Sequence, residues 1–178
     1  MNRRWIKFCA LAFVILLLTI VSLLAWLSWP TSGTLVGQAV QSDIPAMKRS
    51  LFLGADINGY SMWGWRREIK GDTPLTSAVQ YGGLDAVEFI LSRGADPNQR
   101  DGSGMPPICW AAIHGRMDVA KALVERGADP GLPNVDFYGK PEKTAMDYAR
   151  SERHNDLADY LQAMSEQVGG GDGDKPPN

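Results

Sequence analysis

The sequence contains two copies of nearly the same segment, and this repetition constrains the fold more than any other feature. The first copy covers residues 71–98 and the second covers residues 104–131, so matched positions lie 33 residues apart. Pro74 thus corresponds to Pro107. Such a period is typical of stacked repeat proteins, because one unit of this size cannot bury its own apolar face. We therefore expect neighbouring units to pack on one another.

Each copy has the signals of two short helices. Thr73 suits a helix N-cap, and Pro74 suits the first helical position, where its missing N–H needs no partner. Gly82 ends this helix, a second begins near Asp85, and Gly94 suits a left-handed C-cap. Apolar residues follow at helical spacing: Leu75, Ala78, Val79, Ala86, Val87, Ile90 and Leu91.

These motifs resemble the ankyrin repeat. The quoted residues are TPLTSAVQYGG with GADPN in the first copy, and PPICWAAIHGR with GADPG in the second. Asp101 and Gly104 also match the leading Asp and Gly of the family pattern, whereas Thr76, Cys109 and Asp147 stand where the family usually has histidine. The resemblance implies an all-α solenoid. It also implies weaker hydrogen bonding between repeats at the three positions where the usual histidine is replaced.

Degenerate repeats flank the two regular copies. Residues 34–58 and 144–164 carry related patterns, and Asp43 is placed to cap a second helix in the first of them. We expect an ankyrin-repeat domain at 34–165, with about four repeats, two of them capping. A polar tail at 166–178 is expected to be disordered. The apolar positions of the flanking repeats are Ile44, Met47, Leu51, Ala145, Ala149, Leu157, Ala158 and Leu161.

Residues 8–29 form a run of 22 residues without a charge. As a helix they would measure about 33 Å, enough to cross a hydrocarbon core of about 30 Å. Trp26 and Trp29 lie at the far end of the run, where indole rings favour the headgroup layer. We predict one transmembrane helix that acts as a signal anchor, followed by a linker at 30–33.

The basic residues predict the orientation of this span. Residues 1–7 contain three of them, and the next basic residue after the span is Lys48. By the positive-inside rule, 1–7 is a cytoplasmic N-terminus and the rest is exported. We expect a single-pass protein of the bacterial inner membrane with a periplasmic ankyrin domain. A cleaved signal peptide is the alternative, although its apolar core would be shorter and would precede an A-x-A-like site.

The charge balance and the reactive residues exclude several functions. The predicted exported part has 15 basic and 20 acidic residues. We expect no nucleic-acid binding, because proteins that bind nucleic acids usually have a basic stripe on their surface. His114 and His154 lack a Cys or His at metal-ligand spacing, and Cys109 is predicted to be a buried apolar residue rather than a nucleophile. Cys9 lies in the predicted span, so no intramolecular disulfide is expected. We predict no enzyme activity, no metal and no cofactor.

An enlarged turn before the first regular copy is rich in residue types that dominate protein interfaces: Trp63, Trp65, Arg66 and Arg67. These side chains would contact a partner. Two alternatives are that a tryptophan covers the first repeat, or that the turn touches the membrane surface. Phe137 and Tyr138 occupy the second enlarged turn and are candidates for the same role.

The resemblance to ankyrin proteins implies further contact positions, which are variable in that family. They are Ile69, Lys70, Asp72, Gln80 and Tyr81 in the second repeat, and Ser103, Met105, Ile113 and His114 in the third. We expect a non-enzymatic, monomeric module that is tethered to the membrane and binds a protein partner through its concave face and turn tips. The alternative is an immunity protein that neutralises a toxin in the periplasm.

Overall fold

The computed structural model describes Thr19 and residues 32–61, 71–136 and 138–169. The chain divides into two compact units, Met1–Pro30 and Thr31–Asn178. Within the described residues, no helix is both long and apolar enough to span a bilayer. The predicted span at 8–29 lies outside them except for Thr19, so it stays a prediction.

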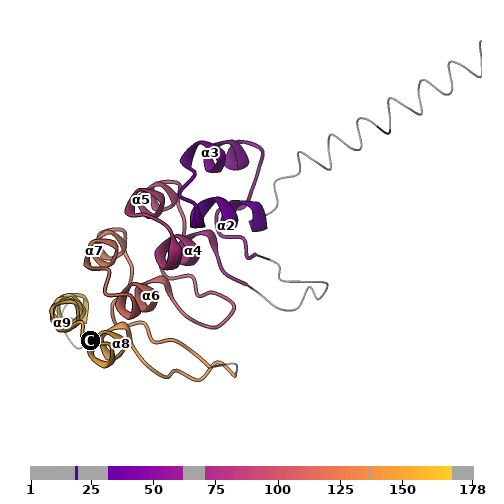
Figure 1. The fold of residues 1–178 in the computed structure, drawn as a ribbon. Helices are drawn as coiled ribbons and strands as arrows, with labels where there is room; N and C mark the ends of the chain where they lie inside the picture. The colour runs from indigo at the N-terminus through magenta and orange to yellow at the C-terminus, as the bar shows by residue number, and fades with distance from the viewer. Residues whose placement is uncertain (1–18, 20–31, 62–70, 137, 170–178) are drawn as a thin grey trace, which may run out of the picture. The chain divides into compact units, whose positions relative to one another are not determined.

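The second unit is built from helix pairs arranged in two layers (Figure 1). The layer beside the long connections contains α2 (Ser32–Val40), α4 (Pro74–Tyr81), α6 (Pro107–Ile113) and α8 (Ala145–Ser151). The other layer contains α3 (Ile44–Phe52), α5 (Leu84–Ser92), α7 (Met117–Glu125) and α9 (Asn155–Gly169). We call these the inner and outer layers. Apart from one isolated bridge between Val135 and Pro141, the described residues contain no β-structure, as the predicted all-α solenoid requires.

Side-chain caps start α3, α4 and α8. Thr73 caps α4 through a capping box, in which its hydroxyl accepts from the Thr76 N–H and its own N–H donates to the Thr76 hydroxyl, at 2.9 Å. Thr144 and Asp147 form the same arrangement at α8, and Asp43 caps α3. Thr76 and Asp147, which replace the usual histidine, therefore hydrogen-bond within their own repeat.

The core lies between the two layers and contains the residues expected from the helical spacing. All seven apolar positions of the first regular copy are at most 5% exposed, and Gly94 has the left-handed φ of +86° that the C-cap prediction requires. In the flanking repeats Ile44 and Leu51 are half-buried and pack against this core. The remaining predicted residues are buried: Met47, Ala145, Ala149, Leu157, Ala158 and Leu161.

Polar side chains connect the turn of one repeat to the preceding repeat. The Arg116 guanidinium donates to the carbonyl oxygens of Val79 and Gly82, at 2.8 and 2.9 Å. It thereby satisfies carbonyls at the end of α4 that have no partner within the helix. One repeat earlier, the Gly83 N–H donates to the Ser42 hydroxyl at 2.7 Å. These bonds fix the register between neighbouring helix pairs.

Asparagines at the ends of the repeats form a second ladder. The Asn58 side-chain oxygen accepts from the Asp96 N–H at 3.0 Å, and the Asn98 oxygen accepts from the Asp129 N–H at 2.8 Å. The Asn98 amide also donates to the Gly127 carbonyl at 3.0 Å. Hydrogen bonding between repeats thus persists without the family histidines, by way of these asparagines.

The helices extend past both expected limits of the repeat domain. Helix α2 begins at Ser32, inside the expected linker at 30–33, although the early Gly33 disfavours a helix; serine is a residue that favours a helix start, and Pro30 lies before it. Helix α9 runs to Gly169, which corrects the predicted start of the disordered tail at 166. Glu166 and Gln167 are good helix formers, and the helix ends only where a glycine run begins.

Candidate interaction surface

Three long connections lead from an outer helix to the next inner helix, and we call them fingers. They span residues 53–73, 93–106 and 126–144, and their described parts extend beside the inner layer (Figure 1). Backbone bonds join neighbouring fingers: the Gly102 N–H donates to the Gly71 carbonyl, and the Val135 N–H donates to the Gly104 carbonyl. The fingers therefore continue the inner layer as one surface.

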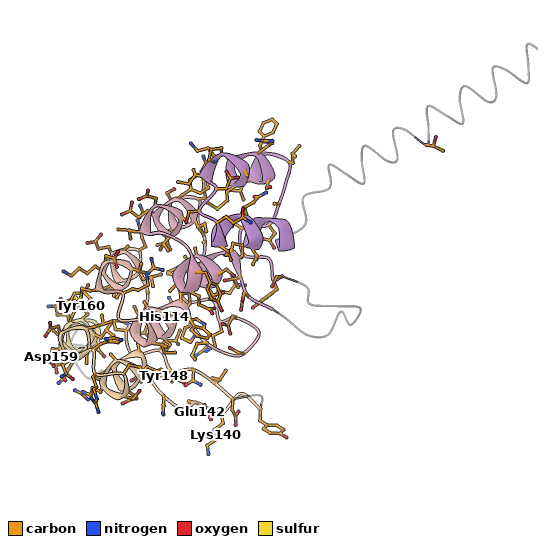
Figure 2. The ribbon with its side chains drawn as sticks, in the orientation of Figure 1. His114, Lys140, Glu142, Tyr148, Asp159 and Tyr160 are labelled. Atoms are coloured by element: carbon orange, nitrogen blue, oxygen red, sulfur yellow. The ribbon has the colours of Figure 1, made fainter. Side chains whose placement is uncertain are left out.

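The third finger is a hairpin whose tip is exposed. The Asn134 N–H donates to the Lys143 carbonyl at 2.8 Å, and the Asp136 N–H donates to the Lys140 carbonyl at 2.9 Å. The Asp136 carboxylate accepts from the Tyr138 and Lys140 N–H groups and so shapes the tip. Tyr138 is 90% exposed there, and Lys140 lies on the finger away from the helices (Figure 2).

Large side chains also stand on the inner helices. Tyr81 ends α4 and is 65% exposed, and His114 takes the corresponding exposed position after α6 (Figure 2). The Trp110 ring stacks on the His114 ring, with centroids 6.0 Å apart. The Trp110 indole N–H donates to the buried Asp101 carboxylate at 2.7 Å. A hydrogen bond to the second finger thus holds this aromatic pair in place.

Other candidate residues of the third repeat are partly engaged in the fold. The Ser103 hydroxyl donates to the Asp101 carboxylate, and the half-buried Met105 packs against the core. Ile113 is half-buried. In the second repeat, the Gln80 amide nitrogen is buried without a hydrogen-bond partner in the described part of the chain.

A cleft of about 520 Å³ opens where α2 and α4 meet the base of the first finger. Its lining comes from three separate segments: Val36, Gly37, Val40, Ser61, Asp72, Ser77 and Tyr81. The base of the finger is closed by two backbone bonds, from the Ser61 N–H to the Asp72 carbonyl at 2.8 Å and from the Gly71 N–H to the Ser61 carbonyl at 3.0 Å. The finger thus places the Asp72 side chain at the cleft.

The Asp72 carboxyl is held in an unfavourable environment for its charge. Partial burial raises its pKa, and the nearby Asp101 carboxylate raises the pKa further. The neighbouring Ser77 hydroxyl lowers it in part, although the two groups do not reach hydrogen-bonding geometry. Asp72 is therefore a carboxylate that lines a cleft. No cationic side chain of the described residues is among the causes of its pKa shift.

Several predicted contact residues lie outside the described part of the chain, and they stay predictions. They are Trp63, Trp65, Arg66, Arg67, Ile69, Lys70 and Phe137. Val36, Val40, Ser61 and Ser77 of the cleft are not among the contact residues expected from the sequence. The Gly-Ala-Asp motifs that begin at Gly54 and Gly94 lie 40 residues apart, and at this spacing Val40 corresponds to Gln80. An alignment of the degenerate first repeat at every position would therefore have selected Val40 as a contact residue.

The reactive side chains named from the sequence are engaged in the fold. Cys109 is buried, and burial raises the pKa of its thiol to about 12, so the nucleophilic thiolate does not form near neutral pH. The His154 ring packs against Gly115, where a Cβ atom would lie 2.6 Å from it. Within the described ranges, no three acidic, histidine or cysteine side chains gather as metal ligands.

Stacked helix pairs with a joined row of fingers define a helical-repeat protein, a class whose exposed inner surface is its interaction surface. Residues 75–124 match the family model described as "Ankyrin repeats (many copies)". Over these residues the chain is therefore similar to ankyrin repeats, which are generally non-enzymatic and indicate a protein–protein interaction module.

Two related proteins also match only part of the chain, over 73 and 70 residues. The chain is 37% identical over 73 residues to the 2-5A-dependent ribonuclease of Mus musculus, covering 40% of this chain and 9% of that protein. It is 43% identical over 70 residues to Arf-GAP with coiled-coil, ANK repeat and PH domain-containing protein 3 of Homo sapiens, covering 39% of this chain and 8% of that protein. The chain thus spans less than a tenth of these relatives, and their activities do not transfer with the match.

Proposed function

We propose that the ankyrin-repeat unit binds a protein partner through its inner surface, formed by the exposed side chains of the inner helices and fingers. The observation that carries this proposal is the exposure of Tyr81 at the end of α4 and of His114, stacked with Trp110, at the matching position of the neighbouring α6. The core positions of these helices are filled mostly by small and aliphatic residues. Aromatic side chains bring large contact area at little entropic cost, which is why they dominate interface energetics. This surface corresponds to the concave face expected from the family resemblance.

Partner capture by matched variants tests this proposal. The full-length tagged chain is used as bait in its native cells, together with a Tyr81→Ala/His114→Ala variant and a Glu88→Ala/Glu125→Ala control on the outer helices. We expect the inner-surface variant to bind at least about tenfold more weakly, which is about 1.4 kcal/mol. The outer-layer control should bind normally, because Glu88 and Glu125 are exposed on α5 and α7, in the layer away from the fingers (Figure 1).

Equal capture by all three proteins would place the interface elsewhere and contradict the proposal. Quantitative mass spectrometry of the captured protein gives the readout, and circular dichroism of each bait confirms that the variants fold. The nature of the captured protein separates a scaffold role from neutralisation of a periplasmic toxin.

We also propose that residues 8–29 anchor the chain in the inner membrane with the repeats in the periplasm. The support is the 22-residue uncharged run and the three basic residues before it. A reporter that is active only in the periplasm should give signal when fused after Asn178. The protein should also remain with the membranes after a carbonate wash. Recovery of a shortened, soluble form would show that the segment is cleaved.

A further inference from the structure

The cleft between α2, α4 and the first finger contains polar groups that the packing of the repeats does not use. Ser61 and Ser77 are 8% and 1% exposed, and neither hydroxyl oxygen has a hydrogen bond in the described part of the chain. A buried hydroxyl without a partner destabilises the fold, so such groups require a specific explanation. Both residues line the same cleft as the half-buried Asp72 carboxylate.

The rest of the cleft is apolar and partly open. Val36 and Val40 line it from α2, and the Val40 side chain is 37% exposed. Tyr81 also lines it and is 65% exposed. A carboxylate beside aliphatic and aromatic surface is complementary to a side chain that has an apolar stem and a cationic head.

We propose that this cleft binds an arginine side chain of a protein partner, with the Asp72 carboxylate accepting hydrogen bonds from the guanidinium group. This inference rests on the proposed function and names the chemistry that one part of the inner surface recognises. The stem of the arginine lies against Val36 and Val40, and the guanidinium plane stacks on the Tyr81 ring. Arginine fits better than lysine, because its planar fork donates to both carboxylate oxygens and stacks on an aromatic face.

The electrostatic environment favours a cationic occupant over the alternatives. A guanidinium beside Asp72 would offset both causes that disfavour its charge, which are partial burial and repulsion from the Asp101 carboxylate. An anionic ligand would add a further repulsion. The buried Ser61 and Ser77 hydroxyls line the same cleft and can accept from an entering N–H.

A small cationic probe tests the inference without a protein partner. The full-length chain in neutral detergent is titrated with N-acetyl-arginine amide, and backbone amide shifts are followed by NMR. We expect saturable shifts at Gly37, Ser61 and Tyr81 in the millimolar range that is usual for so small a ligand. The neutral isostere N-acetyl-citrulline amide should bind much more weakly, because it lacks the charge.

Two variants locate the binding. Asp72→Asn should weaken binding of the arginine probe at least about fivefold, since it removes the charge-assisted acceptor. Asp85→Asn is the matched control, because Asp85 is an exposed carboxylate on α5 outside the cleft, and it should leave the affinity unchanged. Absence of saturable shifts, equal binding of the citrulline amide, or equal loss in both variants would overturn the inference.

Thermal unfolding of Asp72→Asn gives an independent check. The substitution should leave the melting temperature at neutral pH unchanged or raise it, because it removes a partly buried charge that Asp101 repels. A clear fall would show that a cation of the chain itself already occupies the cleft, and would overturn the inference.

The two proposals fail in different ways. If the arginine probe does not bind while Tyr81→Ala/His114→Ala still abolishes partner capture, only the assignment of the cleft to arginine is wrong. If the probe binds and partner capture does not depend on the inner surface, the proposed function is wrong and the cleft remains an arginine site.

Discussion

Leu123→Ala is expected to lower the free energy of unfolding by about 2–5 kcal/mol, as large-to-small changes in a packed core do. Leu123 lies on α7 at the position that matches Ile90 of α5, and it is 0% exposed. Because each repeat is stabilised mainly by its neighbours, the loss should spread through the short stack and lower the melting temperature of the whole unit.

Urea titration of residues 31–178, the second compact unit, measures this effect. Glu125→Ala on the same helix is the matched control, since Glu125 is exposed, and it should change the stability by no more than about 0.5 kcal/mol. A loss below about 0.5 kcal/mol for Leu123→Ala would show that the site does not belong to a close-packed core.

Gly104→Ala is expected to cost about 2–5 kcal/mol for two separate reasons. Gly104 has a φ of +83°, where an L side chain is strained. A Cβ atom there would also lie 2.2 Å from the Val135 carbonyl oxygen and 2.9 Å from a Val135 methyl group. The change must therefore displace the third finger and weaken the bond from the Val135 N–H to the Gly104 carbonyl.

Gly94→Ala separates these two causes. Gly94 has a similar φ of +86°, yet a Cβ atom added there would meet nothing within 4 Å, so only the backbone strain of about 1–2 kcal/mol applies. Urea titration measures the loss of unfolding free energy in both variants, and the difference between the two losses is due to the close approach of the fingers. Hydrogen exchange at the Val135 amide should be faster in Gly104→Ala and unchanged in Gly94→Ala. Equal costs for the two substitutions would contradict the contact between the fingers.

The local structure of each repeat could be predicted because its causes lie within a few residues of each other. The Thr73–Thr76 capping box needs only residues three apart, and the helical spacing of Leu75, Ala78 and Val79 selects their buried face without knowledge of the neighbours. The same holds for Gly94, whose place at the end of a helix calls for a left-handed conformation. The family match then extends this interpretation to residues 75–124.

The residues of the proposed interaction surface were selected only in part from the sequence. Tyr81 and His114 were selected because the family resemblance places them at positions that are variable among ankyrin repeats, and both are exposed on the inner layer. Ser61 and Ser77 were not selected, because a serine is common on any surface and its lack of a hydrogen bond is a property of the surrounding packing. The role of Asp101 as the acceptor for Trp110 also depends on how the second finger folds over α6.

The sequence alone thus determined the repeat period, the helix pairs, their caps and their buried faces, since each follows from local dihedral preferences and hydrophobic spacing. Only the tertiary structure decided how one repeat lies on the next. It brought Arg116 to the end of α4, Val135 to Gly104, and Asp72 to a cleft lined by α2. These contacts join residues about 30 or more positions apart in the chain, and their geometry depends on the stacking of whole repeats, which no local pattern encodes.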